Sequence, residues 1–129
     1  MHLTIKSSPF FLLEEHLTRL QRNLESLQFS SLDFDEIRTG ISKLLSLNPI
    51  PEATLYIQVS RGYQAIRSHA FSKNGEKLKP TIFMFQQAFS DPYAPLRVGG
   101  AKVRTELDSR WKRCDIKVTS LIPNTIALQ

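Results

Sequence analysis

The sequence of 129 residues contains a single cysteine, Cys114, so no disulfide can form within one chain. Such sparing use of cysteine is typical of proteins from a reducing compartment. No apolar run approaches the length of a membrane span. The short apolar stretch at 9–13, which follows Lys6, is interrupted at once by Glu14 and Glu15, and this is not the pattern of a signal peptide. We therefore expect a cytoplasmic protein that does not contact a membrane.

Clusters of positive charge are also missing. Lys and Arg outnumber Asp and Glu by 17 to 12, a formal net charge of +5, yet the basic residues are scattered along the chain. No run of five or six Lys and Arg residues occurs, and such runs are the electrostatic footprint of nucleic-acid binding. The hypothesis of a small basic nucleic-acid-binding protein is supported by net charge alone. We therefore favour a solvated basic surface and expect no nucleic-acid partner.

The usual short signatures of catalysis and metal binding are absent. The sequence has no Gly-rich phosphate loop, and no serine lies in a nucleophile-elbow context. The three histidines, His2, His16 and His69, and Cys114 do not have the spacing of a metal-ligand set. We therefore expect no metal site and give His16 no functional role.

Hydrophobic periodicity predicts two helices in the first part of the chain. Leucines recur at spacings of four and three: Leu13, Leu17, Leu20, Leu24 and Leu27. A second helix is expected from Asp33 to about Asn48, because Asp33 and Glu36 have the spacing of a capping box. Its expected apolar face consists of Phe34, Ile37, Ile41, Leu44 and Leu45. Gly40 should weaken this helix slightly.

Strands are predicted on both sides of these helices. Alternation of apolar and polar residues indicates strands at 2–6 and 54–60, and the apolar run 81–85 favours a strand buried on both faces. A Pro-rich loop at 91–95, a strand that follows Gly99 and Gly100 and runs through Val103, a strand at 111–116, and a helix from Pro123 to Gln129 complete the expected order. Helices and strands that follow one another without strict alternation argue for a single α+β domain.

The stretch from Arg110 to Lys117 is the strongest candidate for chemistry. Lys117 follows Ile116, so the two side chains would point in opposite directions in an extended segment. A lysine that points inward can have a lowered pKa, which frees a neutral amine for Schiff-base chemistry. A surface lysine on an edge strand is the alternative that these residues alone leave open.

A resemblance to a known family bears on this choice. The stretch RWKRCDIK, followed by LIPN and Ala127, resembles the segment R-W-x-R-C-D-I-K-S-x-N-L-L-P-N-x-x-A of D-amino-acid aminotransferases. These are class IV (fold-type IV) enzymes that depend on pyridoxal 5'-phosphate (PLP). The lysine of that segment is the family's PLP lysine. The resemblance therefore implies that Lys117 binds PLP as a Schiff base and is the catalytic residue.

Two further segments resemble the same family in the same order. The stretch LLEEHLTRL is similar to a helix whose arginine contacts the cofactor phosphate, and this position is Arg19. The stretch IQVSRGYQAIRSHAF is similar to a loop with an R-x-H pair that binds the substrate carboxylate, which implies Arg67 and His69. Taken alone, Arg19 could be an ordinary solvated arginine, and the spacing of Arg67 and His69 is common.

The resemblance implies a fold, an activity and an assembly. The expected fold is the N-terminal α+β domain of the family, with a small mixed or antiparallel sheet and two helices, spanning 1–129 and incomplete at both ends. The implied activity is amino-group transfer between D-amino acids and 2-oxo acids in a homodimer, with a second domain supplying the acidic partner of the PLP pyridine nitrogen. Val118 and Ser120 stand where the family has Ser and Asn. They favour the alternative of a truncated, inactive remnant, and we expect little or no turnover by the isolated chain.

Overall fold

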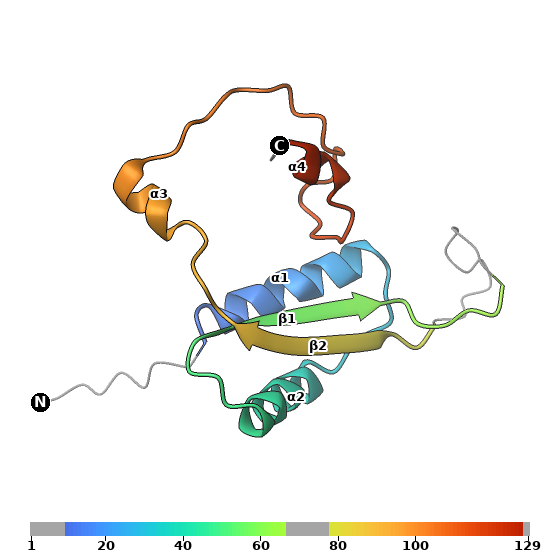
Figure 1. Cartoon of the computed structure of the whole chain (residues 1–129). Coiled ribbons are helices and arrows are strands. Elements are labelled where there is room, and N and C mark those ends of the chain that lie inside the picture. Colours follow the sequence, from blue (N-terminus) through green and yellow to red (C-terminus); the bar gives the residue numbers. More distant parts are fainter. Residues whose placement is uncertain (1–9, 67–77, 128–129) are drawn as a thin grey trace, which may run out of the picture.

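The computed structural model describes residues 10–66 and 78–127, and it shows an α+β arrangement (Figure 1). The elements in chain order are α1 (Leu13–Ser26), α2 (Phe34–Leu47), β1 (Ala53–Ser60), β2 (Thr81–Ala88), α3 (Ala94–Gly99) and α4 (Ile122–Ala127). The two longer helices accompany a two-stranded antiparallel sheet, so the expected fold class is confirmed. The strand predicted at 2–6 lies outside the described residues. Among the described residues, no helix is both long and apolar enough to cross a membrane.

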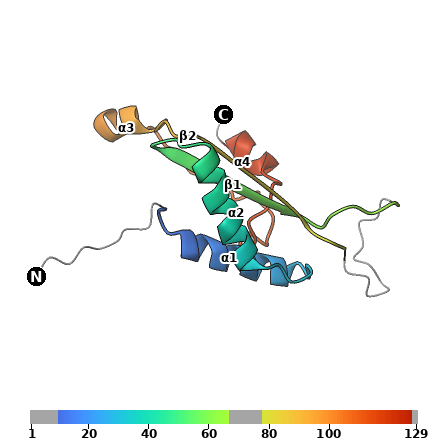
Figure 2. The same cartoon turned by 90° about the horizontal axis from the view of Figure 1, so that it is seen from below.

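The core forms where α1 and α2 meet one face of the sheet. Leu17 of α1 and Ile37 and Ile41 of α2 are each at most 2% exposed. Figure 2 shows α2 lying across the strands, with α1 at an angle to it. The partly buried apolar side chains packed against this cluster come from both helices, both strands and the adjoining loops: Phe10, Leu13, Leu32, Phe34, Leu45, Leu55, Ile57, Ile82 and Met84. The leucine and isoleucine periodicity therefore predicted the buried faces of both helices.

Local capping explains where α2 begins. The Asp33 carboxylate accepts hydrogen bonds from the backbone N–H groups of Asp35 (2.8 Å) and Glu36 (3.2 Å). These N–H groups have no partner within the helix, and an acceptor at the N-cap satisfies them. The predicted start of the second helix at Asp33 is therefore confirmed.

Gly40 has a role in packing that its low helix propensity does not reveal. A Cβ atom at this position would lie 2.8 Å from Cε of Met84 on β2. This is closer than two carbon atoms pack in a protein interior. The absence of a side chain at Gly40 therefore lets α2 approach the sheet closely at the point where Met84 packs.

The two strands pair over their whole lengths and leave one face of the sheet open. Tyr56 lies opposite Phe85, and their rings stack with centroids 5.0 Å apart. On this face Tyr56 is 39% exposed and Phe83 is 57% exposed. The prediction that the strand beginning at Thr81 is buried on both faces is therefore wrong. The helices cover only the face that carries Ile82 and Met84. The sequence is apolar without interruption here because aromatic residues occupy the other, open face.

The segment between β2 and α4 differs most from expectation. The predicted loop at 91–95 is helical at its end, because α3 begins at Ala94, and the strands predicted after Gly100 through Val103 and at 111–116 do not form. From α3 the chain arches over to α4 without regular structure (Figure 1). A strand requires a neighbouring strand for its hydrogen-bond ladder. Val103 and Leu107 are at least 90% exposed, and Ile116 is the one residue of 99–116 that is buried, so no alternating buried face fixes a register.

An ion pair ties α1 to α2. The Arg38 guanidinium donates to both carboxylate oxygens of Glu14, at 3.2 and 2.7 Å, and also to Asp35 at 2.9 Å. The hydrogen bond from Arg38 holds the pKa of the Glu14 carboxyl below its ordinary value of 4.5. Because the folded-state pKa is depressed, the pair stabilises the fold above that value and is lost as the pH falls below it.

Core burial at Ile37 predicts a large loss of stability on truncation. Ile37→Ala should lower the free energy of unfolding by about 2–5 kcal/mol, because the substitution removes buried methyl groups and leaves a cavity. Urea unfolding followed by circular dichroism would measure this loss. Leu47→Ala, at a position of the same helix that is 68% exposed, is the matched control and should change stability by less than about 0.5 kcal/mol. Equal losses in both variants would contradict the core described above.

The Glu14–Arg38 pair predicts a specific pH dependence. Glu14→Gln should lower the melting temperature slightly near neutral pH and have no effect once the pH is well below the ordinary pKa of Glu14, because the wild-type carboxyl is then protonated. Thermal melts of both proteins across this acid range would reveal the convergence. Glu15→Gln, in the same helical turn, is the control. A difference between Glu14→Gln and wild type that stays constant with pH would rule out a contribution from this pair.

Candidate active site

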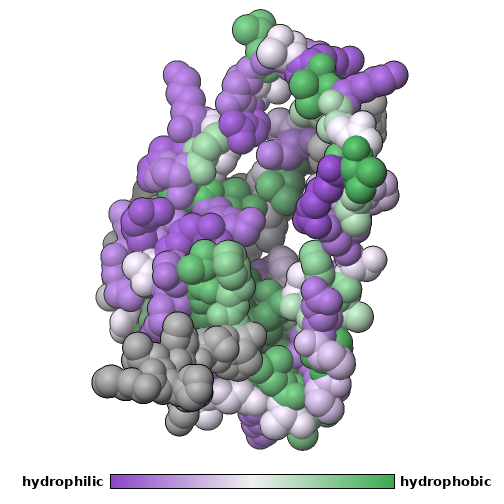
Figure 3. Space-filling model, turned by 90° about the vertical axis from the view of Figure 1, so that its left-hand side faces the viewer, coloured by the Kyte–Doolittle hydropathy of each residue, from purple (hydrophilic) through white to green (hydrophobic). Residues whose placement is uncertain are grey.

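A cleft of about 1050 Å³ lies between α1, β1 and the segment that precedes α4. All of β1 from Ala53 to Ser60 lines it, and Figure 3 shows apolar side chains gathered in a hollow with hydrophilic side chains around it. Polar side chains enter from α1, namely His16, Arg19 and Asn23. The opposite wall contains Lys117, Val118, Thr119 and Leu121. The cleft therefore combines an apolar floor with a few polar groups, as small-molecule sites do.

The fold brings two of the sequence-predicted site residues to the same cleft. Arg19 lies in the middle of α1 and Lys117 lies just before α4, far apart in sequence, and both line the cleft. Both side chains are exposed to solvent. Arg67 and His69, the predicted carboxylate-binding pair, lie outside the described residues.

His16 is a member of the site that sequence analysis missed. It lies one turn before Arg19, and a guanidinium nitrogen of Arg19 donates to His16 Nδ1 at 3.0 Å. Residues three apart on a helix share a face, and this spacing was the signal in the sequence that could have linked the two. The imidazole orients the guanidinium at the mouth of the cleft.

A turn anchors the segment that carries Lys117. The backbone N–H of Ile116 donates to the carbonyl of Arg113 at 3.2 Å, and the Cys114 thiol donates to the carbonyl of Trp111 at 2.9 Å. Ile116 is only 4% exposed, while Lys117 next to it is exposed along the cleft. The two side chains therefore point in opposite directions, as expected. Ile116 enters the protein interior, whereas Lys117 faces the cleft.

The arginines of this segment are neutralised locally. Arg110 forms a two-pronged pair with Asp108, at 2.9 and 2.8 Å, and Arg113 forms a similar pair with Asp115. Hydrogen bonds from Arg110 lower the pKa of Asp108 to about 2. The pKa of Asp115 is lowered chiefly by Arg113 and to a smaller degree by the charge of Arg22 on α1. Arg110 and Arg113 thus organise the backbone around Lys117.

The cleft has a one-sided charge pattern. Arg19, Lys117 and His16 line it, whereas none of its lining residues in the described part of the chain is Asp or Glu. Excess positive charge next to apolar walls favours an anionic ligand. Within residues 10–66 and 78–127, no group of three or more His, Cys, Asp or Glu side chains could hold a metal ion.

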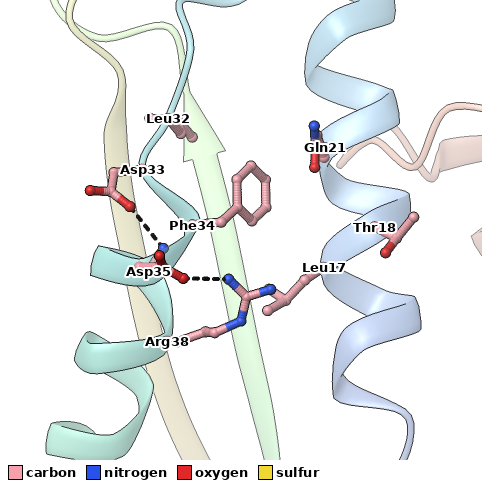
Figure 4. A pocket seen from close by; sticks show the side chains of 8 residues that line it. All are labelled: Leu17, Thr18, Gln21, Leu32, Asp33, Phe34, Asp35 and Arg38. Carbon is pink, nitrogen blue, oxygen red and sulfur yellow. Dashed lines mark hydrogen bonds and ion pairs between the residues drawn. The ribbon is translucent and has the colours of Figure 1, made fainter.

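A second, smaller pocket of about 360 Å³ between α1 and the start of α2 has a different character (Figure 4). Its charged groups already bind one another. Asp33 caps α2, and Arg38 pairs with Asp35 inside the pocket and with Glu14 nearby. These contacts stabilise the junction between the helices, so the larger cleft is the better candidate for a ligand site.

Comparison with known proteins identifies the family. Residues 3–129 match the sequence profile of the family described as amino-transferase class IV. The chain belongs to the class IV aminotransferases. A D-alanine aminotransferase of Staphylococcus epidermidis is 34% identical over 118 residues, which cover 91% of this chain and 40% of that protein. The Staphylococcus aureus protein of that name is 30% identical over 127 residues, 98% of this chain and 44% of the relative. The chain thus spans about two fifths of the length of these relatives.

The residues of the cleft fit the cofactor of class IV aminotransferases. PLP carries an aldehyde, which condenses with a primary amine, and a phosphate group, for which a guanidinium is a matching donor. Lys117 and Arg19 supply this amine and this guanidinium along one cleft of about 1050 Å³. The donor set therefore matches both ends of the cofactor.

Burial of Ile116 predicts that this side chain holds the Lys117 segment in place. Ile116→Ala should increase backbone hydrogen exchange across residues 111–121, because the anchoring apolar contact is lost. Hydrogen–deuterium exchange with mass spectrometry would measure this, with Leu107→Ala as the control because Leu107 is 95% exposed. Unchanged exchange in Ile116→Ala would show that the segment is held by other contacts.

Proposed function

We propose that this chain provides the lysine side of a PLP site for amino-group transfer between D-amino acids and 2-oxo acids. The observation that carries the proposal is that Arg19 and Lys117 line one cleft free of lining carboxylates within the described residues. The names of the relatives, which are D-alanine aminotransferases, support the choice of D-amino acids as substrates.

Each residue of the chain has a distinct task in this proposal. Arg19 would bind the cofactor phosphate, with its guanidinium oriented by His16 at 3.0 Å. The Nζ atom of Lys117 would bind the cofactor as a Schiff base and, once released, would move the Cα proton of the substrate, first as general base and then as general acid. PLP when bound supplies the electron sink that makes this proton acidic. Arg67 and His69 would bind the substrate carboxylate.

Turnover would require groups beyond those that line the cleft in the described residues. PLP needs an acidic partner for its pyridine nitrogen to act as a strong electron sink, and no Asp or Glu lines the cleft in the described residues. We infer that a second domain supplies this partner and that the assembly is a cytoplasmic homodimer. The chain spans only 40–44% of the relatives' length, which is consistent with this division.

The second candidate is a remnant that keeps the fold and is catalytically inactive. It is favoured by Val118, which lines the cleft where the family segment has a serine, and by Ser120, where the segment has an asparagine. An apolar side chain next to Lys117 cannot donate a hydrogen bond to a ligand. This candidate predicts loss of chemistry without loss of the fold.

The Lys117 proposal predicts selective covalent capture of PLP. With PLP equimolar to the protein, borohydride should fix one adduct at Lys117, because the amine faces a cleft in which Arg19 also binds the phosphate. Peptide mass spectrometry would locate the adduct. Lys117→Ala should abolish it, while Lys112→Ala, a lysine of the same segment that does not line the cleft, should leave it unchanged.

The results of this experiment also separate the two candidate functions. Equal labelling of many lysines, or an adduct that survives Lys117→Ala, would contradict the proposal. The chain alone should transaminate D-alanine little or not at all, because no Asp or Glu lines the cleft in the described residues to serve as the partner of the pyridine nitrogen. Substantial turnover by the chain alone would show that no additional domain is required.

A further inference from the structure

Asn23 is the one buried polar side chain among the described residues. It is 5% exposed, lies on α1 one turn beyond Arg19, and lines the cleft. Its backbone carbonyl accepts from the N–H of Leu27, which continues the helix. Its side-chain amide forms no hydrogen bond with the described residues, yet its atoms are not among those closed off from solvent without a partner. Because Asn23 lines the cleft, a ligand in the cleft can accept hydrogen bonds from this amide.

The position of Asn23 relative to Arg19 indicates the chemistry of such a ligand. His16, Arg19 and Asn23 follow one another at spacings of three and four, so they form a single polar stripe along α1. All three residues line the cleft. One guanidinium nitrogen of Arg19 is engaged by His16, and a guanidinium has further N–H donors. The Asn23 amide adds two N–H donors one helical turn further along.

The chemistry of the stripe fits an anion with several oxygen atoms. A carboxamide beside a guanidinium can bind a different oxygen atom of the same phosphate group, whereas an amino group or a metal cation would be repelled by Arg19 and Lys117. The lining residues of the cleft in the described part include no Asp or Glu that could bind such a cation. An anion with several acceptor oxygens, such as a phosphate monoester, therefore satisfies both side chains.

We propose that the Asn23 side-chain amide donates a hydrogen bond to the phosphate that Arg19 binds, which makes the His16–Arg19–Asn23 stripe of α1 a two-donor phosphate subsite. The inference rests on the proposed function in one respect, namely that this phosphate belongs to PLP. The phosphate subsite itself can be tested without the cofactor.

Titration with inorganic phosphate is the direct test. In the isotope-labelled chain, the Asn23 side-chain amide signals should shift on addition of phosphate. Asn23→Asp, which keeps the size of the side chain but cannot donate when ionised, should weaken phosphate binding about tenfold or more, because a charge-assisted hydrogen bond is replaced by repulsion. Asn23→Ala should weaken it less. Gln21→Ala, on the same helix but outside the cleft and bonded to Glu25 at 3.0 Å, should bind phosphate as wild type does.

A comparison of two aldehydes connects the subsite to the cofactor. PLP and pyridoxal carry the same aldehyde, but only PLP carries phosphate, so Asn23→Asp should reduce capture of PLP at Lys117 and leave capture of pyridoxal unchanged. Equal phosphate affinity in wild type and Asn23→Asp would overturn the inference, as would equal losses of PLP and pyridoxal, which would mean that Asn23 only supports the fold. Asn23-dependent phosphate binding without any adduct at Lys117 would uphold the subsite and reject the proposed function.

Discussion

The packing of Leu17 against Ile37 and Ile41 fixes the position of α1, and the candidate site depends on α1 more than on any other element. One side of this helix supplies the core leucine, while His16, Arg19 and Asn23 reach the cleft from the same three turns. Because the core leucine and the three polar residues belong to one helix, their positions relative to one another are fixed. A loss of core packing would therefore move the polar stripe relative to β1 and Lys117 even though none of its own side chains had changed.

The other wall of the cleft is held quite differently. Lys117 belongs to a segment without regular structure, anchored by the burial of Ile116 and by local pairs between arginines and aspartates. Such exposed pairs contribute little free energy individually, so this wall depends mainly on the burial of Ile116 and on the turn before it. The cleft thus combines a guanidinium on a packed helix with an amine on a segment that lacks regular structure.

The sequence predicted the elements whose stabilisation is local or periodic. The leucine and isoleucine spacing and the Asp33 cap were sufficient for α1 and α2, and alternation was sufficient for β1. The strands expected after Gly100 through Val103 and at 111–116 do not form, because strand formation depends on partners that local patterns cannot supply. For the site, the resemblance pointed to Arg19 and Lys117, and the fold places both along one cleft. The burial of Asn23 could not be predicted, since it arises only when distant segments enclose α1.

Gly40 and Met84 form a helix–sheet contact that can adjust. The Cε atom of Met84 lies only 2.8 Å from where a Cβ of residue 40 would be, so the two positions compete for the same space. This Cε atom is the end of a flexible side chain, so a β-carbon at position 40 would be accommodated by a movement of the Met84 side chain. The contact between α2 and β2 is thus adjustable at this point, because a flexible side chain and not the backbone of the strand meets the helix.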